Sequence, residues 1–198
     1  MPGPSQPAPP PVSAFTLANP GEPLVRFVDR VRSLVSNGQK LAQRVAGIGA
    51  AAELLASSGL ELPAGVRHAG DDAYGRNLVY RDPDFGFILV AMVWPAGAES
   101  PIHDHGTWCC LGVLEGTVEV AAFERRSGGG IREVARTECG SGTVCSILPP
   151  RGDIHRVFNP SETPALTLHT YGTERSHCLV FDPRTGAESP HPLTYCNV

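Results

Sequence analysis

The sequence contains no apolar run that approaches the roughly 18 to 20 residues needed for a bilayer-spanning helix. Its N-terminus lacks a basic region followed by a hydrophobic stretch. It also lacks an excess of positive charge, because 16 Lys and Arg residues stand against 20 Asp and Glu, a net charge of -4. This charge balance gives no excess of basic residues for binding nucleic acid or an anionic membrane. We therefore expect a cytoplasmic protein whose partner is a small molecule.

Paired cysteines and internal repeats are missing as well. The six cysteines are scattered without a Cys-x-x-Cys pair, so neither a zinc ribbon nor a dense disulfide framework is indicated. We expect most of them to be reduced thiols. A chain of 198 residues is long enough for one domain with a sizeable core and too short for two of ordinary size.

Composition divides the chain into a tail and one domain. Residues 1–14 are rich in proline and have almost nothing to bury, which predicts a disordered tail. Residues 15–198 are predicted to form a single domain with a helical cap over about 22–58. Within this cap, apolar residues recur at helical spacing over 23–36 and about 39–56.

The pattern of apolar and polar residues changes after the helical cap. From about residue 64 to residue 198, short apolar or alternating runs are separated by Gly, Pro and Asp, as in "FGFILVAMVWPAG" and "ALTLHTYG". Repeated short strands with turn residues between them are typical of a β-barrel or a β-sandwich. The sequence thus predicts a mainly β fold with N-terminal α-helices.

Two histidines one residue apart indicate a metal site. In an extended strand, side chains two residues apart point to the same face, so His103 and His105 would present their imidazoles side by side. Such a pair can hold a metal ion, although His-x-His alone is weak evidence.

Eight residues at fixed spacing, the two histidines among them, strengthen that prediction. They are Gly97, His103, His105 and Gly116 in one segment and Pro150, Gly152, His155 and Asn159 in another. Their spacing resembles the two sequence motifs of the cupins, with a longer gap only before Pro150. The resemblance implies a double-stranded β-helix, or jelly-roll barrel, whose interior holds one metal on His103, His105 and His155. Three neutral imidazoles suit Fe, Zn, Cu or Ni, so the ligands alone do not name the ion.

One departure from the cupin motif is informative. Most metal cupins have a glutamate where this chain has Cys109. Loss of the carboxylate leaves a metal with open coordination positions, which a substrate thiolate and dioxygen could occupy. In this respect the sequence resembles the cysteine dioxygenase type I family, the thiol-oxidising branch of the cupins.

Two further sets of residues carry the same resemblance. Tyr74 and Arg76 match the family's Tyr-x-Arg-Asn, whose arginine binds the substrate carboxylate, a group that a guanidinium can grip with two hydrogen bonds. Thr167, His169 and Tyr171 match its outer-sphere Ser-x-His-x-Tyr relay, with threonine supplying the hydroxyl in place of serine.

The resemblance implies a non-haem iron(II) enzyme that oxidises L-cysteine with O2 to cysteine sulfinate, and it suggests a monomer. A related alternative is a 3-mercaptopropionate dioxygenase, because Trp108 after His-x-His resembles bacterial enzymes of that kind. Those enzymes typically have glutamine at the position of Arg76, which favours cysteine. A third alternative is a non-catalytic cupin that binds metal or a small ligand.

The adjacent cysteines raise a separate question. In animal members of the family, the cysteine at the position of Cys109 forms a thioether with the relay tyrosine, here Tyr171. The spacing in this chain is one residue shorter. Parity favours an inward-facing Cys109 and an outward-facing Cys110, whereas a bulge at Gly106 would reverse that assignment. The roles of Cys110, Cys178 and Arg175 stay open; for Cys178 a packed thiol is favoured.

Overall fold

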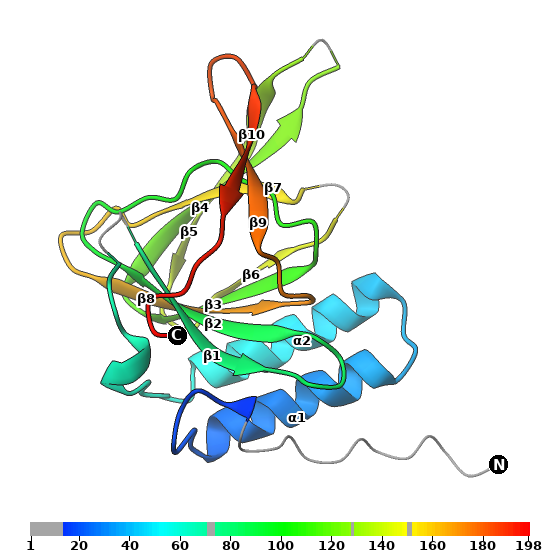
Figure 1. Ribbon diagram of the computed structural model, residues 1–198, viewed down its shortest axis with the longest axis vertical. Helices are drawn as coiled ribbons and strands as arrows, with labels where there is room; N and C mark the ends of the chain where they lie inside the picture. The colour runs from blue at the N-terminus through cyan, green and yellow to red at the C-terminus, as the bar shows by residue number, and fades with distance from the viewer. Residues whose placement is uncertain (1–13, 71–73, 128, 150–151) are drawn as a thin grey trace.

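The computed structural model describes residues 14–70, 74–127, 129–149 and 152–198. Two α-helices are followed by ten strands in this part of the chain, so the prediction of a mainly β fold with N-terminal helices is confirmed (Figure 1). The predicted disordered tail falls almost wholly on residues 1–13, which lie outside the described residues, as does Pro150 of the second motif.

The two predicted helices are confirmed as α1 (Glu22–Ser36) and α2 (Leu41–Ala56). Helix α1 buries one apolar face, and Gly38 follows it with φ 71°, a conformation that glycine adopts without steric cost. Gly47 lies where the helices approach each other, because a Cβ atom there would stand 3.0 Å from the side chain of Leu34. Close helix packing thus explains a glycine in the middle of α2. The residues that α1 buries are Leu24, Phe27, Val28, Val31, Arg32 and Leu34.

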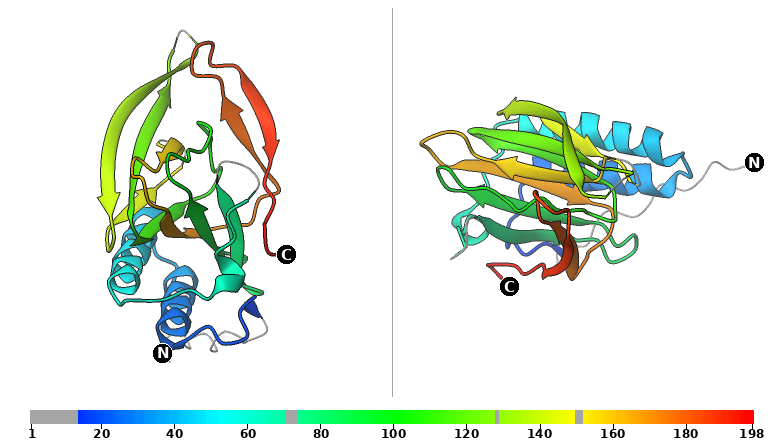
Figure 2. Two further views of the ribbon diagram at one scale, coloured as in Figure 1. Left: turned by 90° about the vertical axis from the view of Figure 1, so that its left-hand side faces the viewer. Right: turned by 90° about the horizontal axis from the view of Figure 1, so that it is seen from above.

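The strands form three antiparallel sheets. Five strands pair in the order β1-β2-β8-β3-β6, three in the order β5-β4-β7, and two as β10-β9. Helix α2 packs on β3 and β6, so the helix pair covers the outer face of the five-stranded sheet (Figure 2). The strands are β1 (Gly75–Arg81), β2 (Ile88–Trp94), β3 (Cys109–Glu115), β4 (Thr117–Arg125), β5 (Ile131–Gly140), β6 (Val144–Ile147), β7 (Ile154–Phe158), β8 (Ala165–Tyr171), β9 (His177–Phe181) and β10 (Glu188–Pro192).

Residues on both faces of β2 and β8 are buried, which explains the continuous apolar sequence of β2. Leu89 and Leu168 face the helices. Val90 and Leu111 face the interior, where they share a core with Val157 of the three-stranded sheet. The two sheets therefore enclose a common interior, and every second residue of β3 and β8 points into it.

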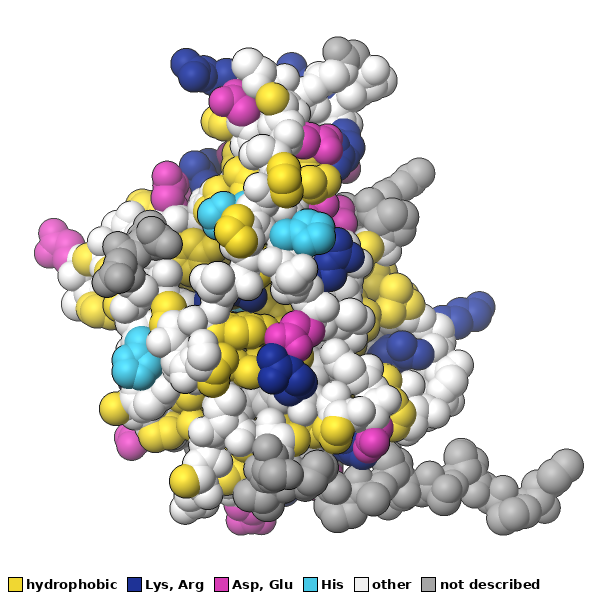
Figure 3. Space-filling model, in the orientation of Figure 1, with side chains coloured by type: hydrophobic (Ala, Val, Ile, Leu, Met, Phe, Trp, Pro, Cys, Tyr) yellow, Lys and Arg dark blue, Asp and Glu magenta, His cyan; other side chains and the backbone are white. Residues whose placement is uncertain are grey.

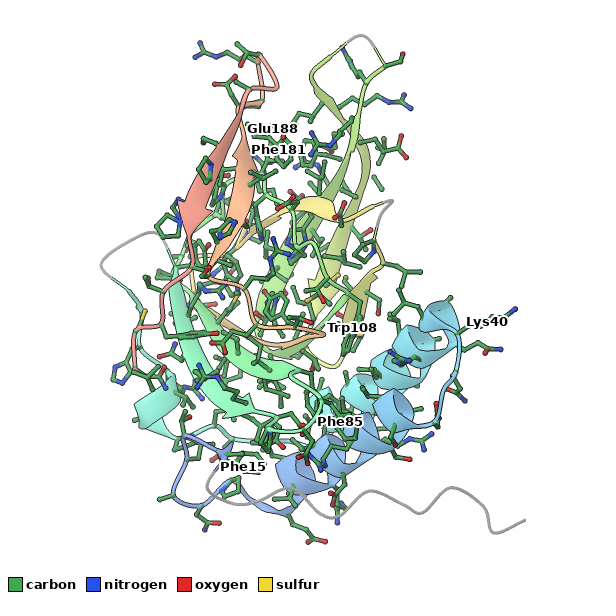
Figure 4. All side chains as sticks on the ribbon, turned by 45° about the vertical axis from the view of Figure 1, so that its right-hand side comes forward. Phe15, Lys40, Phe85, Trp108, Phe181 and Glu188 are labelled. Atoms are coloured by element: carbon green, nitrogen blue, oxygen red, sulfur yellow. The ribbon has the colours of Figure 1, made fainter. Side chains whose placement is uncertain are left out.

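The hairpin of β9 and β10 rises beside that of β4 and β5 (Figure 2). Arg125 of β4 joins them, because its guanidinium lies 4.8 Å from the ring centre of Phe181 and pairs with the carboxylate of Glu188 (Figure 4). Acidic and basic side chains are interspersed on the face shown in Figure 3. Neither helix of the described residues has the length and apolar composition of a membrane span.

Candidate metal centre

Three histidines converge in the interior. His155 comes from β7, whereas His103 and His105 lie in the connection between β2 and β3, so the prediction that this pair sits in a strand is wrong. The backbones of His103 and His155 nevertheless exchange two hydrogen bonds of 2.9 Å. This bridge brings the three rings together, and one nitrogen from each lies within 4.8 Å of the others.

The rings are oriented by backbone carbonyls. Nδ1 of His103 donates to the oxygen of Pro101 at 2.9 Å, and Nδ1 of His105 donates to the oxygen of Asp153 at 3.1 Å. Since a carbonyl can only accept, both nitrogens carry a proton, and Nε2 of each ring keeps its lone pair for a metal.

Burial keeps these imidazoles neutral. It lowers the pKa of His103 to about 4 and that of His105 to about 3, and it lowers the pKa of His155 well below its usual value. Nε2 of His105 and Nδ1 of His155 are buried without a hydrogen-bond partner among the described residues. Neutral, converging and unsatisfied ring nitrogens fit a transition-metal ion.

Cys109 lies beside this group and not within it. Its side chain points into the interior, with Sγ 3.9 Å from Nδ1 of His169, while Cys110 faces α2 with Sγ 3.7 Å from the carbonyl of Val45. The parity argument is thus confirmed, although Gly106 has a positive φ of 59°. Burial raises the pKa of the Cys109 thiol well above its usual value, so it stays protonated.

The three relay residues lie along the inner face of β8. The hydroxyl of Thr167 and Nε2 of His169 are 2.9 Å apart, and Nδ1 of His169 is 3.0 Å from the hydroxyl of Tyr171. Burial lowers the pKa of His169 well below its usual value and raises that of Tyr171 well above its own, so both side chains are neutral.

Trp94 completes the relay, and the sequence did not indicate it. Its indole Nε1 donates to Oγ1 of Thr167 at 2.9 Å. The Thr167 hydroxyl keeps its own proton and a second lone pair, so it can donate to Nε2 of His169 in one ring tautomer and accept from it in the other. In the tautomer in which Thr167 donates, the ring proton lies on Nδ1 and points at the oxygen of Tyr171. This order leaves the Tyr171 hydroxyl proton free to donate elsewhere.

Cys109 and Tyr171 are direct partners across β3 and β8. Both side chains belong to the same interior cluster. Side chains paired across antiparallel strands have Cβ atoms about 4.5–5.5 Å apart. The register therefore supports the predicted thioether, which stays a prediction.

A pocket opens next to the histidines and encloses about 340 Å³, part of it open to solvent. Arg76 reaches it from β1, and Nε of this guanidinium is buried without a hydrogen-bond partner among the described residues. Tyr74 immediately precedes β1 and stacks on Trp94, with ring centres 4.7 Å apart. The pocket is lined by Arg76, Ile88, His103, Asp104, His105, Thr107, Tyr171, Thr173, Arg175, Cys178 and Leu193.

Two residues whose roles the sequence leaves open are now located, together with Trp108. Arg175 and the buried Cys178 line the pocket. Trp108 is buried outside it, against Gly172 at the end of β8 (Figure 4). Leu193 is a pocket residue that sequence motifs gave no sign of, because it lies near the C-terminus without a recognisable pattern around it.

The family model and the curated relatives that match this chain agree on one family. The family model described as cysteine dioxygenase type I matches residues 22–184. Cysteine dioxygenase type 1 of Rattus norvegicus is 34% identical over 128 residues, and that of Homo sapiens is 33% identical over the same length. The alignments cover 62% of this chain, which spans about 62% of the length of these curated relatives.

Solved structures with a similar arrangement include an oxalate oxidase in complex with the substrate analogue glycolate. It is 17% identical and has a TM-score of 0.47, over 62% of this chain and 65% of the other. The cupin domain of Schizosaccharomyces pombe Cnp3 is also 17% identical, with a TM-score of 0.42 over 52% of this chain and 67% of the other.

Proposed function

The chain belongs to the cysteine dioxygenase type I family, and from this premise we propose that it is a non-haem iron(II) thiol dioxygenase. The proposed reaction adds both atoms of O2 to the sulfur of L-cysteine and gives cysteine sulfinate. One observation carries the proposal: three neutral imidazoles, with no carboxylate among them, converge beside a pocket that contains a guanidinium with an unsatisfied Nε.

His103, His105 and His155 would hold the metal. Iron(II) bound there supplies open coordination positions for a thiolate and O2 and favours deprotonation of the substrate thiol. Cys109 stands where most metal cupins have a carboxylate ligand, and its raised pKa keeps it protonated. It therefore does not compete with the substrate thiolate for the metal.

Arg76 binds the other end of the substrate in this proposal. Its guanidinium can donate two parallel hydrogen bonds to a carboxylate, which fixes the orientation of the thiol as well as its position. Hydrogen bonds to charged groups contribute about 1.5–3 kcal/mol each. The pocket wall formed by Arg76, His103 and Tyr171 brings the carboxylate site, the metal site and the relay together.

The relay holds one proton at a defined atom. In this proposal Thr167 donates to Nε2 of His169, so the ring proton lies on Nδ1 and faces the oxygen of Tyr171. The Tyr171 hydroxyl can then donate its hydrogen into the pocket, where negative charge develops as oxygen is transferred to sulfur. We also propose that the enzyme acts in the cytoplasm as a monomer.

Oxygen uptake tests the function directly. Purified protein loaded with iron(II) is assayed with L-cysteine, 3-mercaptopropionate and cysteamine, and the highest kcat/KM is expected for L-cysteine. Absence of uptake with every thiol contradicts the proposal. A higher kcat/KM for 3-mercaptopropionate than for L-cysteine would make 3-mercaptopropionate the substrate. Metal bound without uptake supports the non-catalytic alternative.

Arg76→Gln tests the carboxylate site. We expect KM for L-cysteine to rise by about tenfold or more, because a charge-assisted contact of at least about 1.5 kcal/mol is lost. Cysteamine has no carboxylate, so its KM should stay the same. Arg132→Gln is a matched control, since Arg132 is exposed on β5. An unchanged KM for L-cysteine removes Arg76 from the substrate site.

A further inference from the structure

The last residues of the chain lie along β1, beyond the residues 22–184 that match the family (Figure 1). The backbone N–H of Cys196 donates to the oxygen of Arg76 at 2.7 Å. The side-chain amide of Asn197 accepts from the N–H of Leu78 at 2.8 Å and donates to its oxygen at 2.9 Å. Since β1 is an edge strand, Cys196 and Asn197 satisfy backbone groups that would otherwise face solvent.

One side chain of this segment lines the pocket, and a second contacts Arg76, which is a residue of the pocket wall. Leu193 lines the pocket, and its backbone is anchored by a hydrogen bond of 2.9 Å to the oxygen of Ser176. The guanidinium carbon of Arg76 lies 5.7 Å from the ring centre of half-buried Tyr195. An arginine at this distance over an aromatic ring is attracted by about 0.5–1 kcal/mol at an exposed site and more when desolvated.

Tyr195 also forms a hydrogen bond with the carboxylate of Glu174. Its hydroxyl donates to Glu174 at 3.0 Å, and Arg81 donates two hydrogen bonds of 2.6 Å to the two oxygens of Glu174. The contact with Arg81 lowers the pKa of Glu174, so Glu174 is ionised. Burial and the Glu174 carboxylate raise the pKa of Tyr195 to about 12, which keeps the hydroxyl protonated as a donor.

These contacts position Arg76 without pairing it with a carboxylate among the described residues. The Glu174 carboxylate is engaged by Arg81 and Tyr195, so it is not available to pair with Arg76. The Tyr195 ring meanwhile supports the guanidinium without occupying any of its N–H donors. An anion in the pocket can therefore bind Arg76 without first displacing a protein carboxylate.

We propose that residues 193–197 form part of the substrate pocket and that Tyr195 is a positioning residue for Arg76, so that this segment contributes to the selection of thiols that carry a carboxylate. The inference rests on the proposed function and applies equally to L-cysteine and 3-mercaptopropionate. It adds to the pocket a segment that lies outside the family match.

Tyr195→Leu tests the role of the ring. We expect about a fivefold rise in KM for L-cysteine, corresponding to about 1 kcal/mol, with kcat changed by less than about twofold. KM for cysteamine should not change. Tyr195→Phe keeps the ring and leaves both oxygens of Glu174 bonded to Arg81, so its KM should stay within about twofold of the wild-type value. Val198→Ala, at an exposed neighbouring residue, is the matched control.

A second variant detaches the segment from outside the pocket. Asn197→Ala removes the two hydrogen bonds to Leu78 and should raise KM for L-cysteine selectively, as Tyr195→Leu does. Unchanged KM in both variants overturns the inference. An equal rise for cysteamine also overturns it, because a general structural defect would affect both substrates.

Failure of the proposed function gives a different result. In that case the wild-type protein takes up no oxygen with any thiol. The inference is then tested by calorimetric titration of the zinc-loaded wild-type and Tyr195→Leu proteins with L-cysteine. About fivefold weaker binding to the variant supports the role of Tyr195, and equal binding or no binding to either protein overturns it.

Discussion

Replacing Thr167 with valine tests the hydrogen bonds of the relay at the hydroxyl that joins Trp94 to His169. The Thr167 side chain is completely buried, and its hydroxyl is the link between the indole of Trp94 and Nε2 of His169, each at 2.9 Å. Valine has nearly the same shape without the hydroxyl. The substitution therefore removes hydrogen bonds and creates almost no cavity.

The expected loss of stability comes from the two buried groups that lose their hydrogen bond to Thr167. A buried polar group that loses its hydrogen-bond partner costs about 1–3 kcal/mol. Trp94 can only donate and loses its acceptor, and Nε2 of buried His169 loses its hydrogen-bond partner. Thr167→Val should therefore lower the free energy of unfolding by about 2–6 kcal/mol. It should also lower kcat by about tenfold or more, because the ring proton of His169 is no longer confined to Nδ1.

Urea unfolding of the metal-free protein measures the first effect, and oxygen uptake by the iron-loaded protein measures the second. Thr170→Val is the matched control, since Thr170 is buried on the opposite face of the same strand. A free energy of unfolding within about 0.5 kcal/mol of this control would refute the assigned hydrogen bonds. An unchanged kcat would refute the role of the tautomer.

The remaining predictions concern acid stability and the thioether. Because burial lowers the pKa of His103 to about 4 and that of His105 to about 3, the unfolded metal-free chain binds more protons than the folded one between pH 6.5 and these values. Stability should therefore fall as the pH drops below about 6.5, by up to about 1.4 kcal/mol per pH unit for each ring, and a flat profile in urea unfolding between about pH 7 and pH 5 would contradict this. The cross-strand register of Cys109 and Tyr171 predicts a linked peptide lacking two hydrogens after repeated turnover with L-cysteine and O2; mass spectra with only separate peptides would reject the link, and Cys110→Ser should leave it intact.

Local sequence was sufficient to predict the helices and the three histidines. Apolar spacing identifies α1 and α2 because a helix that covers a sheet must bury one stripe. The strand predicted for His103 and His105 was wrong for a long-range reason. The segment is held by β9, since Asp104 bonds to Leu179 through both its backbone N–H and its side chain. A hydrogen bond between residues 75 positions apart in the chain produces no periodic pattern in the local sequence.

The supporting residues of the site were beyond sequence reasoning for the same reason. Trp94 ends an apolar strand, and nothing in that run distinguishes an indole that donates to Thr167 from one that only packs. Tyr195 acts through Arg76 and Glu174, which are 119 and 21 residues away. Cys110 is explained by tertiary contacts, because its sulfur packs between the carbonyl of Val45 in α2 and the hydroxyl of Ser146 in β6.

Charge in the pocket links the missing carboxylate ligand to the choice of substrate. The lining includes the guanidinium groups of Arg76 and Arg175 and one carboxylate, that of Asp104, which already accepts a hydrogen bond from the backbone of Leu179. With neutral imidazoles as ligands and Cys109 protonated, nothing among the ligands balances the charge of a bound divalent metal. A substrate that brings both a thiolate and a carboxylate supplies two negative charges, one near the metal and one near Arg76. Cysteamine supplies only the thiolate, so it should bind less tightly than L-cysteine or 3-mercaptopropionate for an electrostatic reason that does not depend on the shape of the pocket.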